Sequence, residues 1–378
     1  MKRYGRSIVS EFLGNHIAYR GLNAQDSRLP SLAELRASLR LPGQGVPRKT
    51  SPDYASMVSY LLRRARALEA PNTEISSLIF VGDTRLNDAT AFSNMCAAGN
   101  WPGIAFICAE KTQEEPYREI VQKEVNRSVY FANRWKMLPA FSQYLEEHEV
   151  EVNEHTAIIL DLDKTCIGAR GRNDQVIDQA RVEAAYSTVK TLIGADFDAP
   201  AFERAYRLFN QPEFHPFTTD NQDYLVYVCL MISAGLYAQD PLADEVRNGR
   251  LFRFDQLLSE VDAQVSQLPA GVREIHEDVY DRTRQGDPTP FKVFRANEYR
   301  ETVARMGQMG AETPLNELLN QEIVITREVQ QVAAEWKFKG ALLFGLSDKP
   351  DEASIPSAEL ANQGFLPIHQ TETDVVGS

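Results

Sequence analysis

The sequence predicts an α/β protein built on a parallel sheet, with a large helical insertion between parts of that sheet. Three observations predict this class. The apolar run 157–160 leads straight into two aspartates, as in a strand buried on both faces of a parallel sheet. Residues 76–111 have the pattern of a strand, a turn, a helix and a strand, which is an α/β unit. Residues 170–319 hold six amphipathic segments separated by turn residues, and these predict an all-helical block.

The first part of the chain supplies an α/β segment. Residues 1–50 are polar and interrupted by prolines and glycines, so we expect a loose leader with one short helix at "SLAELRASLR". Ser51 is a suitable N-cap before Pro52, and the apolar spacing that follows predicts a long helix. After the α/β unit, residues 128–151 predict another strand and helix that lead to the strand at 157–160.

The α/β pattern returns near the end of the chain. Residues 320–354 predict a strand, a helix, a strand and a turn, and residues 364–378 a last strand with a tail. We therefore expect an N-terminal α/β segment at 1–150, a core formed by 151–169 and 320–378, and a helical insertion at 170–319.

Composition limits the classes of function. The chain has 378 residues, of which 43% are hydrophobic and 25% charged, and it is long enough for two or three globular domains. Its net charge of −13 argues against a nucleic-acid surface, which normally needs a basic face. The four cysteines lack metal-binding spacing, which favours reduced thiols. No segment resembles a signal peptide or a membrane span, so we expect a cytoplasmic protein without a membrane partner.

The two aspartates at the end of the apolar run, Asp161 and Asp163, indicate a ligand site. The carboxyl edge of an open α/β sheet is where ligands bind, and burying an unpaired carboxylate there would cost several kcal/mol. One carboxylate can attack phosphorus and become an aspartyl phosphate, while a second one protonates the leaving oxygen and later activates water. Mg²⁺ would offset the repulsion between the attacking carboxylate and a phosphate dianion.

The pattern Asp161-x-Asp163-x-Thr165 after a strand resembles motif I of the haloacid dehalogenase-like (HAD) phosphohydrolase superfamily. The resemblance implies a Rossmann-like parallel sheet with a C1-type helical cap at the position of the insertion. It implies Asp161 as the nucleophile, Asp163 as the general acid and base, and both as ligands of Mg²⁺. Arg170 and Arg172, just beyond this motif, would bind an anionic substrate together with Thr165.

The same resemblance implies three further groups from the end of the chain. Thr326 terminates a strand and would hydrogen-bond the phosphoryl oxygens. Lys337 or Lys339 would bridge the nucleophile and the phosphate, and the sequence does not choose between them. The strand at 341–346 resembles the acidic motif IV, with Leu346 in place of its first aspartate, and makes Asp348 and then Asp351 the expected metal ligands.

A closer match to motif IV lies in the N-terminal segment, at "LIFVGDTRLND" with Gly82, Asp83 and Asp88. No paired aspartates precede it. Residues 1–150 are therefore either a degenerate partial copy of the same α/β unit, which we favour, or part of a rearranged chain in which Asp83 or Asp88 serves the Asp161 site. A helix N-cap turn rich in Asp and Asn would also explain the pattern.

These features predict a Mg²⁺-dependent phosphatase that acts on a small phosphorylated metabolite. The second aspartate favours phosphoryl transfer over dehalogenation, which does not need it. Two alternatives remain open at the level of sequence. One is a binding or scaffold protein whose catalytic residues have decayed, and the other is a polynucleotide end phosphatase.

Overall fold

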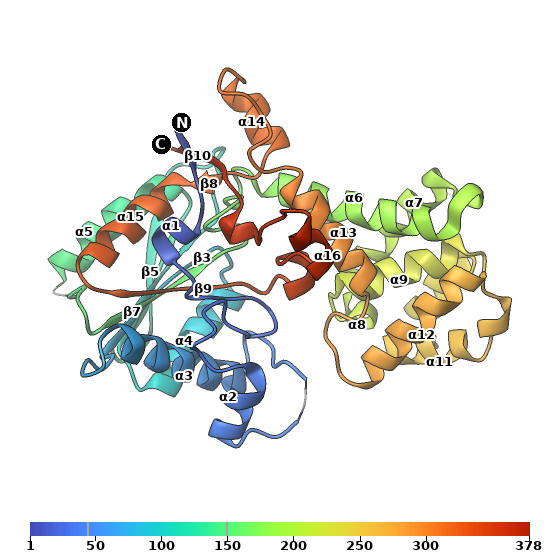
Figure 1. Cartoon of the computed structure of the whole chain (residues 1–378), viewed down its shortest axis with the longest axis horizontal. Coiled ribbons are helices and arrows are strands. Elements are labelled where there is room, and N and C mark those ends of the chain that lie inside the picture. The colour runs from blue at the N-terminus through green and yellow to red at the C-terminus, as the bar shows by residue number, and fades with distance from the viewer. Residues whose placement is uncertain (44, 149) are drawn as a thin grey trace. The chain divides into compact units, whose positions relative to one another are not determined.

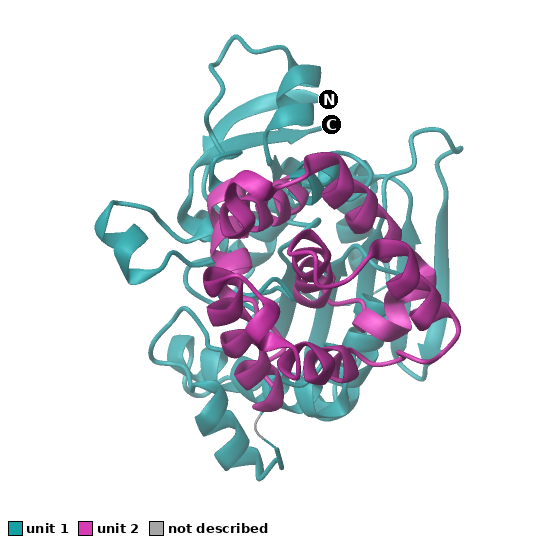
Figure 2. Cartoon of the chain, turned by 90° about the vertical axis from the view of Figure 1, so that its right-hand side faces the viewer, with its two compact units in different colours: residues 1–179, 302–378 teal, residues 180–301 magenta. Residues whose placement is uncertain are grey.

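The computed structural model describes residues 1–43, 45–148 and 150–378. The chain forms two compact units, shown in Figure 2. Unit 1 consists of residues 1–179 and 302–378, and unit 2 of residues 180–301. No helix among the described residues is both long enough and apolar enough to cross a membrane.

Unit 1 is built on a seven-stranded sheet with the order β2-β9-β7-β3-β4-β6-β5. All neighbouring strands are parallel except β5, which runs antiparallel to β6. The strands are β2 (Ile17–Ala18), β3 (Ser77–Gly82), β4 (Gly103–Cys108), β5 (Arg118–Glu124), β6 (Arg127–Ala132), β7 (Thr156–Asp161) and β9 (Leu342–Leu346). This mostly parallel sheet confirms the predicted α/β class.

Helices cover both faces of this sheet (Figure 1). On one face, α3 and α4 pack on alternate residues of the central strands, such as Phe80 and Ile159. On the other face, Phe141 of α5 packs against Trp336 of α15 and against Phe106 of β4. The helices of unit 1 are α1 (Ser10–Leu13), α2 (Leu32–Leu39), α3 (Pro52–Glu69), α4 (Asn87–Gly99), α5 (Leu138–Glu147), α14 (Leu315–Gln321), α15 (Arg327–Phe338) and α16 (Ala358–Asn362).

A second, three-stranded sheet joins the two ends of the chain, as Figure 1 shows. Its order is β1 (Lys2–Ser7), β10 (Thr373–Gly377) and β8 (Ile325–Thr326). β1 runs antiparallel to β10, with Lys2 opposite Gly377, and β8 runs parallel to β10. The buried carboxylate of Asp374 on β10 accepts hydrogen bonds from Arg3 at 2.5 and 2.7 Å.

Unit 2 is helical and has its own apolar core. A buried ionic network lies beside this core, in which Arg295 bonds the carboxylates of Asp223 and Glu298, each at 2.5 Å. Two helices cross the boundary between the units, α6 (Asp174–Ile193) and α13 (Lys292–Val303). The others are α7 (Ala199–Phe209), α8 (His215–Thr218), α9 (Gln222–Ser233), α10 (Gln239–Arg247), α11 (Phe254–Asp262) and α12 (Ala270–Arg284).

The structure differs from the predicted organisation in one important respect. Strands β3, β4, β5 and β6 come from residues 1–150 and lie in the same sheet as β7 and β9. The N-terminal segment also contributes β2, so it supplies five of the seven strands of a single sheet and is not a separate partial copy in front of it. The compact helical block spans residues 180–301, where the sequence placed the insertion at 170–319.

Candidate active site

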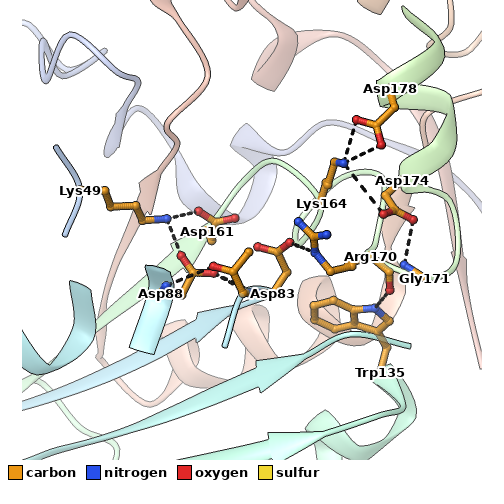
Figure 3. A network of polar contacts seen from close by, with 11 residues as sticks. Lys49, Asp83, Asp88, Trp135, Asp161, Lys164, Arg170, Gly171, Asp174 and Asp178 are labelled. Carbon is orange, nitrogen blue, oxygen red and sulfur yellow. Dashed lines mark hydrogen bonds and ion pairs between the residues drawn. The ribbon is translucent and has the colours of Figure 1, made fainter. Parts of the chain in front are cut away.

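Three carboxylates meet at the carboxyl edge of the central strands. β3 and β7 are parallel neighbours, with Val81 opposite Leu160, so the residues that follow them lie side by side. Asp83, Asp88 and Asp161 each offer an oxygen, and these three atoms lie within 4.8 Å of one another. All three side chains are buried, and Figure 3 shows how they face one another.

The turn after β3 explains why this acidic group can form. The carboxylate of Asp88, in the first turn of α4, accepts hydrogen bonds from the backbone N–H groups of Asp83 at 2.9 Å and Thr84 at 2.8 Å. Gly82 is required here, because a Cβ at this position would lie 2.7 Å from that carboxylate. The Gly-Asp pattern and the aspartate five residues later thus form one compact turn.

Two cations hold the three carboxylates together. The buried ammonium of Lys49 lies 2.5 Å from Oδ1 of Asp161 and 2.7 Å from Oδ1 of Asp88. Arg170, which follows β7, pairs through Nε with Asp83. Figure 3 shows Lys49 and Arg170 on either side of the acidic group.

Burial and charge shift the pKa values of these groups. Burial and the neighbouring Asp88 carboxylate raise the pKa of Asp83 to about 7, although Arg170 opposes the shift. Burial alone would raise the pKa of Asp88 as well. The Lys49 ammonium and the backbone N–H groups outweigh burial and lower the pKa of Asp88 to about 2. Burial alone would lower the pKa of the Lys49 ammonium. The carboxylates of Asp161 and Asp88 outweigh burial and raise this pKa.

The donor set fits a hard divalent cation. Carboxylate oxygens are the ligands that Mg²⁺ and Ca²⁺ prefer. The formal charge of the three aspartates, Lys49 and Arg170 is −1 when all five groups are ionised. Burial raises the pKa values of Asp83 and Asp161, so a bound cation would favour their ionised forms. The acidic group can therefore hold a metal ion.

The structure brings some of the sequence-predicted residues to this site. Asp161 belongs to the acidic group, and Asp163 lies two residues beyond the end of β7, partly buried. Arg170 reaches the site through Asp83. Thr165 is buried nearby in the same loop, and its hydroxyl has no hydrogen-bond partner among the described residues.

Arg172 has a different role from the predicted one. Its guanidinium bonds Glu110 at 2.8 Å and Glu328 at 2.9 and 3.0 Å, and only 1% of its side chain is exposed. All three nitrogens of the guanidinium thus donate to buried carboxylates. Arg172 ties the loop after β7 to Glu110 and Glu328.

The predicted phosphate-binding residues near the end of the chain also lie elsewhere. Thr326 ends β8 in the small sheet, and its hydroxyl donates a hydrogen bond of 2.6 Å to the carbonyl of Thr165. Lys337 bonds the carbonyl of Phe12 at 3.0 Å. Lys339 pairs on the surface with two glutamates of α5 and α15. The helix between β8 and β9 therefore directs its lysines away from Asp161.

Asp348 and Asp351, the predicted metal ligands, are not in the acidic group. Asp348 pairs with Arg20 at 2.9 Å, and 46% of its side chain is exposed. Asp351 accepts a hydrogen bond of 3.0 Å from the backbone N–H of Gly21. Both follow β9, which lies on the opposite side of β7 from β3. Of the two explanations for Asp83 and Asp88, the geometry thus matches the rearranged chain.

Two residues at the site were missed by sequence reasoning. Lys49 is one of them. The sequence does contain a signal for it, because Lys49 precedes a helix and then the strand with the Gly-Asp turn, and the resemblance implies this order. Ser347 is the other. It follows β9, whose Leu346 pairs with Asp161, and its buried hydroxyl accepts a hydrogen bond from the Lys349 backbone N–H at 3.0 Å.

Comparison with family models, curated proteins and solved structures finds no match to this chain.

Proposed function

We propose that this protein is a Mg²⁺-dependent phosphatase that hydrolyses a small phosphorylated metabolite through an aspartyl phosphate on Asp161. The observation that carries the proposal is the meeting of Asp83, Asp88 and Asp161 with Lys49 at the edge of the sheet. Asp161 is also the first aspartate of the pattern that resembles motif I of the HAD superfamily. These residues come from distant parts of the chain, and their meeting supports a resemblance that otherwise rests on residues 161–165.

The residues divide the chemistry as follows. Asp83, Asp88 and Asp161 would hold Mg²⁺, which when bound neutralises negative charge on the phosphoryl group. The Asp161 carboxylate attacks phosphorus, and the bond from phosphorus to the leaving oxygen breaks. Asp163 donates a proton to that oxygen, and then takes a proton from the water that hydrolyses the aspartyl phosphate.

Lys49 and Ser347 would complete the phosphoryl site. Lys49 already bridges two carboxylates, and an ammonium in this place lowers the cost of bringing a dianion to Asp161. Ser347 lies at the end of the strand next to β7, where its hydroxyl can donate to a phosphoryl oxygen. The helical unit 2 occupies the position in the sequence where a C1-type cap is expected, and specificity would depend on its residues.

The direct test compares Asp161→Asn with Asp348→Asn in an assay with p-nitrophenyl phosphate and a panel of phosphorylated metabolites. We expect Asp161→Asn to reduce turnover by about a thousandfold or more with an unchanged circular dichroism spectrum, because the nucleophile is lost. Asp348→Asn should retain most of the activity, since Asp348 pairs with Arg20 outside the acidic group and acts on Lys49 only through its charge. Chelation by EDTA should abolish activity and Mg²⁺ should restore it. Normal turnover by Asp161→Asn would exclude this mechanism.

The alternatives make different predictions in the same experiments. A decayed binding protein would show no turnover on any substrate of the panel, with or without Mg²⁺. Its support in the sequence is Leu346 at an expected aspartate position and the absence of a nucleophile pattern in residues 1–150, and we assign the missing carboxylates to Asp83 and Asp88. A polynucleotide end phosphatase would bind oligonucleotides with an affinity that falls steeply as salt increases.

A further inference from the structure

The two cations of the acidic group are held in different ways. Lys49 is buried and bridges two carboxylates, whereas Arg170 pairs with Asp83 through Nε and keeps 34% of its side chain exposed. Within the described part of the chain, no residue accepts a hydrogen bond from either terminal nitrogen of the Arg170 guanidinium. These two nitrogens form the fork with which arginine binds two phosphoryl oxygens at once.

The backbone of Arg170 is fixed on both sides. Its N–H donates to the carbonyl of Lys164 at 2.8 Å. Its carbonyl accepts hydrogen bonds from the N–H of Glu110 at 2.9 Å and from Nε1 of Trp135 at 3.1 Å, the second of which is drawn in Figure 3. Gly171 comes next, and a Cβ at this position would lie 1.9 Å from the carbonyl oxygen of Glu110. The Arg170 side chain can therefore change its partner while the loop that carries it stays in place.

We propose that Arg170 couples metal binding to phosphate binding, because it gives up the Asp83 carboxylate to a divalent ion and then offers its charge to the phosphoryl group. This inference rests on the proposed function, since it assigns Asp83 to Mg²⁺ and a phosphoryl group to the same site. A carboxylate that is shared with a divalent ion attracts a guanidinium less strongly, because the ion offsets its negative charge. Binding is therefore ordered, with Mg²⁺ first and the phosphorylated molecule second.

The charges of the site favour this exchange. The three carboxylates and two cations have a formal charge of −1 when all are ionised, and a divalent ion changes it to +1. A phosphate dianion then returns the charge to −1. Without Arg170 the same two steps lead to 0 and then −2, so the dianion meets no net positive charge. Arg170 thus reduces the affinity for the metal ion and increases the affinity for phosphate once the metal ion is bound.

Isothermal titration calorimetry of the full chain with Mg²⁺ and with inorganic phosphate tests this coupling. In Arg170→Met, Mg²⁺ should bind about fivefold more tightly, because the competing guanidinium is gone. Phosphate should bind about tenfold more weakly in saturating Mg²⁺, but less than about threefold more weakly in EDTA, where Asp83 engages the guanidinium of the wild type. The gain in phosphate affinity that Mg²⁺ causes should therefore be smaller in the variant than in the wild type.

Two further variants serve as controls. Arg170→Lys keeps the charge without the fork, so it should return the Mg²⁺ affinity toward the wild-type value and the phosphate affinity only in part. Lys111→Met removes a positive charge from the neighbouring loop, where Lys111 pairs on the surface with Glu114. It should change neither affinity by more than about twofold.

Two results would overturn the inference while leaving the proposed function intact. One is equal weakening of phosphate binding by Arg170→Met in EDTA and in Mg²⁺, which would show that Arg170 supplies a fixed charge and exchanges no partner. The other is Mg²⁺ binding by Arg170→Met that is unchanged or weaker. A wild-type chain that binds no Mg²⁺, or no phosphate in its presence, would remove the proposed function together with this inference, and it is recognised before any variant is compared.

Discussion

Lys49 illustrates how the candidate site depends on single charged residues. Its ammonium forms ion pairs with both Asp161 and Asp88, and it is buried with them. Removing one member of a buried ionic group leaves the others without compensation, which costs far more than losing an exposed pair.

Lys49→Met should therefore destabilise the protein by about 3 kcal/mol in EDTA, because two buried carboxylates lose their counter-charge. The loss should be smaller in Mg²⁺, since a divalent ion supplies positive charge to the same oxygens. Urea unfolding with and without Mg²⁺ measures both values. Lys339→Met is the matched control, and its exposed pairs with Glu146 and Glu335 should contribute less than about 1 kcal/mol. Equal losses in the two variants would contradict this account of Lys49.

Arg172 offers a test of structural against substrate-binding roles. Arg172→Met leaves the buried Glu110 and Glu328 unpaired, so we expect a loss of about 3 kcal/mol in the free energy of unfolding. The KM and kcat of the folded variant should stay near the wild-type values.

Arg170→Met provides the comparison for Arg172, because Arg170 pairs with Asp83 inside the site and should alter the kinetics. A tenfold rise of KM in Arg172→Met, without such a rise in Arg170→Met, would instead show that Arg172 contacts the substrate as the sequence predicted.

At the scale of residues, the sequence identifies only those parts of the site that are close together in the chain. Asp161, Asp163 and Thr165 form a local pattern, and so do Gly82, Asp83 and Asp88. The pairing of Lys49 with Asp161 joins residues 112 positions apart, and no local pattern contains it. Lys337 and Lys339 have the expected residue type, but their helix directs them to other partners.

Among the elements, α3 connects the start of the chain to the site. Ser51 caps this helix as predicted, since its hydroxyl accepts a hydrogen bond of 3.2 Å from the N–H of Tyr54. Lys49 lies two residues before this cap, so the start of the helix fixes the backbone from which Lys49 reaches the carboxylates.

Ser51→Ala should cost about 1 kcal/mol of stability through loss of the cap and should also reduce kcat, because Lys49 loses its fixed position. Ser31→Ala is the matched control. Ser31 caps α2 with a complete capping box, and its loss should lower stability without a change in kcat. Thermal unfolding and steady-state kinetics measure the two effects. An unchanged kcat in Ser51→Ala would show that α3 does not position Lys49.

Two of the three strands that the sequence analysis did not predict share one property; the third, β2, is buried but only two residues long. β1 and β5 have the sequences KRYGRS and REIVQKE, and both are largely exposed. Strand prediction from sequence relies on alternating or continuous apolar residues, which mark burial. A strand at the edge of a sheet is held by backbone hydrogen bonds and lacks that pattern. The buried strands β3, β4, β7 and β9 were all predicted.

At the scale of the whole molecule, the order of the strands decides the site. The sequence supports a parallel sheet with helices on both faces, but it does not say that β3 and β9 flank β7. The order of motifs along the chain suggested that residues after Asp161 supply the metal ligands. Sheet neighbours are set by packing between segments far apart in sequence, and a single sequence does not contain that information.

Because the two ends of the chain lie side by side, the order of the site residues along the chain can be changed experimentally. Lys2 lies opposite Gly377, and the Tyr4 hydroxyl donates to the carbonyl of Ser378 at 2.9 Å. A short Gly/Ser linker can therefore join the ends, and the loop at 150–155 can be opened before β7.

In this permutant Asp161 comes before Ser347, Lys49 and Asp83. We expect a native circular dichroism spectrum and the same turnover of p-nitrophenyl phosphate as in the unpermuted chain, because no strand of the sheet is cut. A permutant opened within α3 is the control and should not fold. Failure of the first permutant to fold would show that the connection from α5 to β7 is essential to the sheet.

The position of β7 between β3 and β9 also has a consequence for synthesis of the chain. A ribosome releases residue 82 early, but residue 346 only when nine-tenths of the polypeptide exists. Until then β7 has one open flank. A nascent chain or a product truncated before residue 340 therefore presents an unpaired apolar strand to chaperones and proteases, and cannot yet surround Asp161 with its final neighbours.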